Sequence, residues 1–167
     1  METKWYETQI IGVIVGGLIT LVANWFYRWN ESRIEKNNLK AGINAEISVF
    51  FEFTESVLKT IQKTKKEFES KGSIFEVKMT GVFEFNFIDS NMSKLSIVGG
   101  NLLKKIIELK GLCVAYIEGS KIIFDEISVF NKSGCSKSAL MLSISQAEGT
   151  MKRIKELCDE IIHLTNQ

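Results

Sequence analysis

A long uncharged stretch near the N-terminus constrains this 167-residue chain more than any other feature. No Asp, Glu, Lys or Arg occurs between Glu7 and Arg28, and most of the intervening residues are aliphatic or small. Twenty residues at helical rise cover about 30 Å, roughly the thickness of the hydrocarbon core of a bilayer. The alternative is a buried core helix, but such helices are usually shorter and carry a polar face. Residues 8–29 therefore predict a transmembrane helix.

Aromatic residues flank both ends of this stretch, which is typical of the two membrane–water interfaces. The predicted interface anchors are Trp5, Tyr6, Trp25, Tyr27, Arg28 and Trp29. Basic residues are few before the stretch and gather after it: Arg28, Arg33, Lys36 and Lys40. Because positive charge is retained on the cytoplasmic side, we expect a single-pass protein of the cell membrane. Its N-terminus would lie outside and its C-terminal domain in the cytoplasm.

Small and polar residues recur every four positions within the stretch and share one face of a helix: Gly12, Gly16, Thr20 and Asn24. Small residues four apart let two helix backbones approach closely in lipid, and an amide can hydrogen-bond across the contact. This face predicts self-association through the transmembrane helix, and therefore a homo-oligomer. The alternative is that glycine is simply common in membrane helices and that Asn24 lies at the hydrated headgroup level.

Residues 30–167 are enough for one compact domain with its own core, and the chain has no proline to interrupt long helices. Spacings of four and three predict a long helix that ends at Lys71, with the seam Ile43, Ile47, Phe50, Thr54, Val57 and Ile61. A last helix should start near Ser136 or Ser138, with the seam Leu140, Ile144, Ala147, Met151, Ile154, Cys158 and Ile161. We expect these two seams to pack together.

A third long helix is predicted between them, from Asn101 as its N-terminal cap after the Gly99-Gly100 turn to about Val129. Its expected buried residues are Leu103, Ile106, Ile107, Cys113, Tyr116, Ile117, Ile123, Phe124, Ile127 and Phe130. Gly119 predicts a bend or a close helix contact. The predicted fold class is therefore all-α. An N-terminal transmembrane helix in residues 1–29 continues into a long helix of an antiparallel three- to four-helix bundle in residues 30–167.

Residues 74–88 alternate between apolar and polar side chains, which is typical of a strand. Because an isolated hairpin is marginally stable, we favour a short helix that begins at Gly81 with Thr80 as its cap. The phenylalanines of this segment form a candidate partner patch if their rings are exposed: Phe75, Phe83, Phe85 and Phe87. The alternative is that these rings close the open end of the bundle.

Several short segments follow the N-terminal stretch in a fixed order: KAGINAEI (40–47), TGVFE (80–84), LSIVG (95–99) and LLKKII (102–107). In this order the chain resembles a broad group of small bacterial and prophage-encoded single-pass membrane proteins with a helical cytoplasmic domain. The resemblance covers most of residues 8–110 as a pattern, without a catalytic motif. Those proteins usually carry a proline near the Thr-x-Val-Phe and Gly-Gly segments, which this chain lacks. The resemblance implies the anchored architecture and no particular activity.

The sequence offers little evidence for a catalytic site or a metal site. His163 is the only histidine, and the three cysteines include no C-x-x-C pair: Cys113, Cys135 and Cys158. Asp125 and Glu126 are adjacent, so on a helix they point in different directions. The 21 basic residues balance 20 acidic ones, which argues against a nucleic-acid partner. We therefore expect no enzyme activity, no cofactor and no metal.

The leading hypothesis is a membrane-anchored, non-enzymatic interaction or sensing module. It would sit in the lipid bilayer, self-associate through its transmembrane helix and present the bundle to an unknown cytoplasmic protein partner. The alternative is a membrane-perturbing, pore-forming effector of a prophage or antiphage defence system, in which Gln9, Thr20 and Asn24 face a lumen. Loss of membrane potential on expression distinguishes the two hypotheses.

Overall fold

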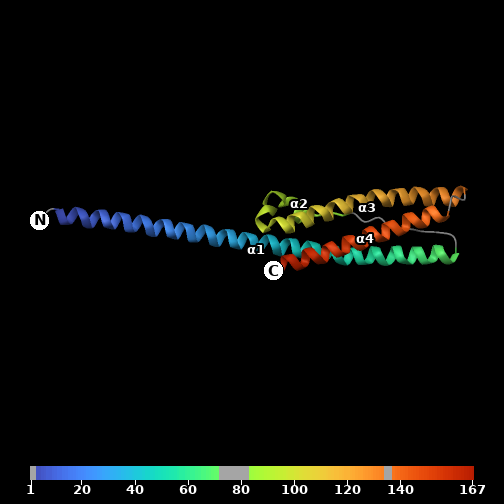
Figure 1. The fold of residues 1–167 in the computed structure, drawn as a ribbon, viewed down its shortest axis with the longest axis horizontal. Helices are drawn as coiled ribbons and strands as arrows, with labels where there is room; N and C mark the ends of the chain where they lie inside the picture. Colours follow the sequence, from blue (N-terminus) through green and yellow to red (C-terminus); the bar gives the residue numbers. More distant parts are fainter. Residues whose placement is uncertain (1–2, 72–82, 134–136) are drawn as a thin grey trace. The chain divides into compact units, whose positions relative to one another are not determined.

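The chain divides into two compact units, residues 1–38 and residues 39–167. The structure, a computed structural model, describes residues 3–71, 83–133 and 137–167. All regular structure in these three ranges is helical, which confirms the predicted all-α class (Figure 1). The sequence-based division after residue 29 was drawn from composition and stays a prediction, whereas the division by contacts falls after Asn38.

The elements follow in the order α1 (Thr3–Lys71), α2 (Asn86–Ser90), the 3-10 helix η1 (Met92–Val98), α3 (Gly100–Ser133) and α4 (Lys137–Thr165). Helix α1 belongs to both units, and its residues from Leu39 onward pack with the other helices in the second unit. Helix α1 is described up to Lys71 and α4 from Lys137, both next to residues that the structure does not describe, so the two predicted helix ends stay predictions.

Helices α1 and α4 run antiparallel, and polar contacts between their side chains show the register. Asn44 contacts Asn166 at 2.7 Å and Glu55 contacts Lys155 at 2.6 Å. Further along, Gln62 lies 3.5 Å from Glu148. From one pair to the next, the α1 number rises by as much as the α4 number falls, which is the mark of an antiparallel pair in constant register. Every residue of the two predicted seams is buried, and their apolar residues belong to one hydrophobic core.

Helix α3 is antiparallel to α4 and therefore parallel to α1 (Figure 1). Lys105 and Glu108 of α3 meet Glu160 and Arg153 of α4 at 2.6 and 3.0 Å. Far from these ion pairs, the Phe130 ring of α3 lies 5.4 Å from the Phe68 ring of α1. The three long helices enclose one continuous hydrophobic core, in which each fully buried aliphatic side chain contributes about 1.5–3 kcal/mol.

The start of α3 differs from the prediction. Asn101 lies inside the helix rather than at its cap, because α3 already begins at Gly100. Gly99 precedes it with a φ of 114°, a left-handed conformation that glycine adopts without the strain a side chain would bring. The Leu103 N–H donates to the Gly99 carbonyl at 3.1 Å, so Gly99 supplies the first acceptor of the helix.

The buried face of α3 was predicted only in part. Five of the expected residues are buried: Ile106, Cys113, Tyr116, Ile123 and Ile127. The prediction for Ile107 was wrong, since its side chain is 57% exposed, and Leu102 and Leu109 are buried instead. The expected close helix contact at Gly119 was also wrong, because a Cβ at this position would meet no atom within 4 Å. The alternative, a bend at Gly119, stays a prediction.

The short helix after the first long helix exists, but it starts later than expected. The predicted cap Thr80 and start Gly81 lie outside the described residues. Helix α2 begins at Asn86, so Phe83 and Phe85 precede it in irregular backbone. The alternative of a strand finds no support in the described part of this segment, residues 83–88.

The first unit consists of the beginning of α1. Side chains are described from Val13 onward, and those between Val13 and Ile34 are exposed. Among the residues that the structure describes, no helix contains a segment both long enough and apolar enough to cross a membrane.

Candidate functional site

The predicted self-association face lies in the first unit. Gly16, Thr20 and Asn24 are exposed there, while Gly12 lies outside the residues whose side chains are described. The Thr20 hydroxyl donates to the Gly16 carbonyl at 2.9 Å, so its polar group is satisfied within the helix. A Cβ at Gly16 would meet no atom within 4 Å, which leaves space for a second helix on this face. Self-association through these residues stays a prediction.

The predicted interface anchors are exposed where they are described. Trp25, Tyr27 and Trp29 are each about half or more exposed, and Arg28 is exposed as well. Trp5 and Tyr6 lie outside the described side chains. The Arg33 guanidinium lies 5.8 Å from the centre of the Trp29 ring, a cation–π distance. Such a pair combines an aromatic ring with a positive charge, as residues at a headgroup layer do.

The described phenylalanines of the candidate partner patch pack into the bundle. Phe83 makes edge-on contacts with Phe53 of α1 and Tyr116 of α3, with ring centres 5.8 and 5.7 Å apart. Phe85 is only 4% exposed and lies 4.9 Å from the Phe50 ring. The rings therefore fill space between α1 and α3. A partner role for them stays a prediction and would require this segment to separate from α1, while Phe75 lies outside the described residues.

Two residues of α1 hold α2 in place. The Glu46 carboxylate accepts hydrogen bonds from the N–H groups of Phe87 at 2.7 Å and Ile88 at 2.9 Å, which caps the N-terminus of α2 from a distant part of the chain. A Cβ on Gly42 would lie 2.1 Å from the tip of the Phe87 ring. Glycine at this position is therefore what lets the tip of the Phe87 ring approach the backbone of α1.

An open groove of about 580 Å³ lies beside this contact. It is lined by Ala45, Glu46, Val49, Phe50, Phe53, Glu84 and Asn86. Its apolar part is formed by Val49 and Phe53, and its acidic part by Glu46 and Glu84. Because the Glu46 carboxylate is already engaged by α2, only Glu84 offers its charge to an occupant without cost to the fold.

Glu148 of α4 is the most strongly perturbed carboxyl group. It accepts a hydrogen bond from Lys152 at 2.8 Å and another from Lys65 of α1 at 3.0 Å. These two contacts, the first above all, lower the pKa of Glu148 to about 2. The group is nearly buried, and both of its partners are structural cations on α1 and α4. It therefore joins α4 to α1 through an ion pair.

A second ion-pair network joins α3 to α4. The Arg153 guanidinium contacts Glu108 of α3 at 3.0 Å and also Glu156 and Glu160 of its own helix. The hydrogen bond from Lys105 lowers the pKa of Glu160, and the bond to Glu108 raises the pKa of Arg153. These groups are largely exposed, so each contact contributes little to stability and mainly fixes the register of the two helices.

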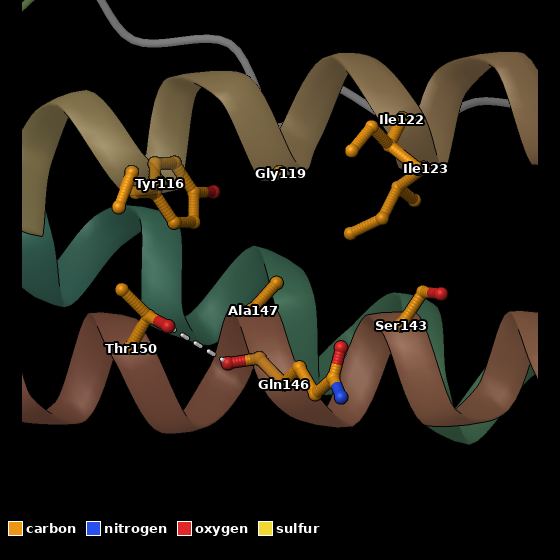
Figure 2. Close-up of a pocket in the computed structure, with 9 residues that line it drawn as sticks. Tyr116, Gly119, Ile122, Ile123, Ser143, Gln146, Ala147 and Thr150 are labelled. Carbon is orange, nitrogen blue, oxygen red and sulfur yellow. Dashed lines mark hydrogen bonds between the residues drawn. The ribbon is translucent and has the colours of Figure 1, made fainter.

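A small hollow lies between α3 and α4 near Gly119 (Figure 2). Tyr116 and Ile123 project from α3 toward α4 on either side of Gly119, and the short Ala147 side chain faces the space. The volume is about 220 Å³, below the 300–1,000 Å³ of typical ligand pockets. Burial raises the pKa of the Tyr116 phenol to about 12, so this group stays protonated. Its lining combines apolar residues of α3 with the polar residues Ser143, Gln146 and Thr150 of α4.

The residues that could carry catalysis are dispersed. Burial raises the pKa of both Cys113 and Cys158 to about 12, which leaves these thiols unreactive at neutral pH. His163 is exposed on α4, with its Nδ1 2.9 Å from the Gln167 amide. Cys135 lies outside the described residues. Within the described ranges, no group of three His, Cys, Asp or Glu side chains is arranged to hold a metal ion.

Comparison with known proteins identifies no relative of this chain. No family model, no curated protein and no solved structure matches the chain. The resemblance to small single-pass membrane proteins therefore stays a prediction that rests on the sequence pattern alone.

Proposed function

We propose that the chain is a membrane-anchored, non-enzymatic interaction module whose N-terminal helix inserts into the bilayer and self-associates. The observation that carries this proposal is the uncharged stretch between Glu7 and Arg28, whose described side chains are exposed all around the helix. Aliphatic side chains that nothing in the chain covers favour lipid or another protein as their surroundings. The second unit, by contrast, has its own hydrophobic core.

Several features of the second unit support a binding role over a catalytic one. Its perturbed carboxyl groups are engaged by lysine and arginine across helix contacts, and its two described cysteines are buried. Its open features are a shallow groove beside α2 and the outer faces of long helices. In the proposed arrangement the bundle lies in the cytoplasm and presents one of these surfaces to a protein partner.

Anchoring is tested by extracting membranes from expressing cells with alkaline carbonate. The wild type should remain in the membrane pellet. Leu18→Lys together with Ile19→Lys should release most of the protein, because each lysine at a membrane centre costs about 2.5–3.5 kcal/mol. The matched control is Val49→Lys together with Leu142→Lys, two equally exposed aliphatic positions of the bundle, which should stay in the pellet. Release of the wild type would refute the anchor.

Self-association within the membrane is tested by energy transfer between two fluorescent fusions of the full chain. Gly16→Leu fills the proposed contact face, whereas Gly17→Leu places the same bulk on a neighbouring face, and neither meets an atom of its own chain. We expect Gly16→Leu and Asn24→Leu to reduce transfer and Gly17→Leu to leave it unchanged. Equal transfer in all variants would contradict the proposed face.

A second candidate function is a pore-forming effector. It is favoured by the two polar side chains, Thr20 and Asn24, on one exposed stripe of an otherwise apolar helix. A pore would depolarise the membrane on induced expression, and Gly16→Leu would prevent this. Unchanged potential with the wild type still in the membrane would favour the interaction module.

A further inference from the structure

Charged residues return to α1 after the uncharged stretch, but none of them falls on one particular stripe of the helix. Tyr27, Asn30, Ile34 and Asn37 follow one another at spacings of three, four and three, so they lie along one side of α1. All four are uncharged, although five of the eleven residues from 28 to 38 carry a charge. We call these four residues the linker stripe.

The side chains of the linker stripe are uncovered in the part of the chain that the structure describes. Tyr27 is 69% exposed and Ile34 is 51% exposed, and both asparagines are exposed as well. Tyr27 and Ile34 are seven residues apart, which places an aromatic and an aliphatic side chain at equivalent positions of two successive heptads. Most helices in proteins owe their stability to the packing of one face. A second helix along this side would cover both side chains.

The sequence before Tyr27 points to a second copy of this chain as that helix. Toward the N-terminus, the same spacing of four and three leads from Tyr27 to Ala23, Thr20 and Gly16, which are also uncharged and exposed. Gly16 and Thr20 belong to the face through which we propose that the membrane helices associate. Two chains that meet at Gly16 and Thr20 therefore bring their linker stripes together without a change of register.

The chemistry of the linker stripe suits a parallel pair. Two chains inserted in one membrane with the same orientation have parallel α1 helices, so each residue of the stripe faces its own copy. A charged residue on the stripe would then meet a like charge, and the stripe has none. An asparagine amide both donates and accepts hydrogen bonds, so Asn30 and Asn37 can each pair with its own copy.

We infer that two copies of this chain form a short parallel coiled coil along the linker stripe, directly after the membrane helix. The inference rests on the proposed function, because the membrane fixes the parallel direction. From Tyr27 to Asn37 the contact spans ten helical steps, about 15 Å. Such a short contact is weak between free chains. It forms here because the membrane contact already holds the two helices at a high effective concentration.

Disulfide cross-linking of the full chain in its membrane tests the geometry. Every variant carries Cys135→Ser to remove a background thiol, and a mild oxidant is added. Asn30→Cys, Ile34→Cys and Asn37→Cys should each cross-link to their own copies, because these positions face each other in a parallel pair. The controls, Ser32→Cys and Lys36→Cys, are exposed positions on the other side of the same helix, and there the product should be lost.

Energy transfer between fluorescent fusions of the same variants separates this inference from the proposed function. Transfer without cross-linking at the linker stripe would show that only the membrane helices meet, and would overturn the coiled coil while the proposed function stands. Loss of both signals would overturn the proposed self-association as well. Equal cross-linking at stripe and control positions would show random collisions between helices, and would also overturn the coiled coil.

A charge placed on the stripe provides an independent test. Ile34→Asp should lower the cross-linked fraction of Asn30→Cys about threefold to fivefold, since two like charges would face each other. Ser32→Asp adds the same charge on the other side of the helix and should leave the fraction unchanged. Equal effects of the two substitutions would show that Ile34 does not lie in the contact, and would contradict the inferred register.

Discussion

Helices α3 and α4 pack against each other with buried apolar seams, yet their outer faces differ. On α4 the exposed positions are mostly polar or charged: Gln146, Lys152, Glu156, Asp159 and His163. On α3 the corresponding positions include Ile107, Val114 and Ile122. A helix with one apolar side is complete when that side meets a core, whereas a helix with two apolar sides exposes a surface to water until something covers it. Burial within one chain therefore explains where the apolar residues of α4 lie, but it does not explain the exposed apolar residues of α3.

The largest expected effect separates the inner face of α4 from the outer face of α3. Ile154→Ala removes a fully buried side chain and should lower the free energy of unfolding by about 2–5 kcal/mol. Ile122→Ala makes the same chemical change on the exposed face and should alter it by less than about 0.5 kcal/mol. Urea unfolding of both variants, followed by circular dichroism under dilute conditions, measures the two values. Similar losses would mean that the α3 face is buried within the single chain.

A second comparison uses two glycines inside long helices. Gly42→Ala should destabilise the fold by about 1–2 kcal/mol, because the new Cβ pushes the Phe87 ring off α1. Gly111→Ala meets no atom within 4 Å and should stabilise α3 by about 0.5–1 kcal/mol, the usual gain of alanine over glycine. Thermal unfolding measures whether each substitution lowers or raises the stability of the fold. A stabilising Gly42→Ala would show that Phe87 does not rest on that position.

An effect of similar size, but one that depends on pH, is expected for the carboxyl group that joins α4 to α1. Glu148 has a pKa of about 2 in the folded protein, below its ordinary value of 4.5, because Lys152 and Lys65 hydrogen-bond to its charged form. Its contribution is therefore full above pH 4.5 and is lost as the pH falls toward 2. Glu148→Gln should cost about 1–2 kcal/mol at pH 7 and progressively less as the pH falls through this window.

The matched control for this effect is Glu118→Gln on the outer face of α3. It should change the free energy of unfolding by less than about 0.5 kcal/mol at any pH of the titration, since Glu118 is exposed. A cost of Glu148→Gln that does not vary between pH 7 and pH 2 would contradict the ion-paired geometry.

The same contrast explains how much of the fold could be predicted from the sequence. Helix α4 has a single apolar stripe, so the spacing of four and three from Leu140 to Ile161 identified most of its buried face and missed only Glu148, Leu157 and Thr165. Helix α3 has apolar residues on two faces, and periodicity alone did not distinguish Ile107, which is exposed, from Leu109, which is buried. The all-α class could be predicted because the long segments follow helical spacing and contain no proline.

The segment before α3 was harder to predict because its structure is fixed by distant residues. Helix α2 begins at Asn86 because the Glu46 carboxylate binds its N–H groups, and that carboxylate is some forty residues earlier in the chain. No residue next to Asn86 in the sequence indicates that a helix begins there. The role of Gly42 was likewise hidden, because only the folded structure brings Phe87 over it.

The most direct test compares the two outer faces in the working protein. Val114→Cys on α3 and Gly149→Cys on α4, each with Cys135→Ser, are labelled with a maleimide in native membranes that hold the full chain. Both positions are exposed within one chain, so a difference in their rates would come from a partner that covers the α3 face. With nine-tenths of the α3 faces covered, Val114→Cys should react about tenfold more slowly than Gly149→Cys, and solubilisation and dilution should remove the difference. Equal rates in the membrane would contradict the claim that the outer face of α3 is covered.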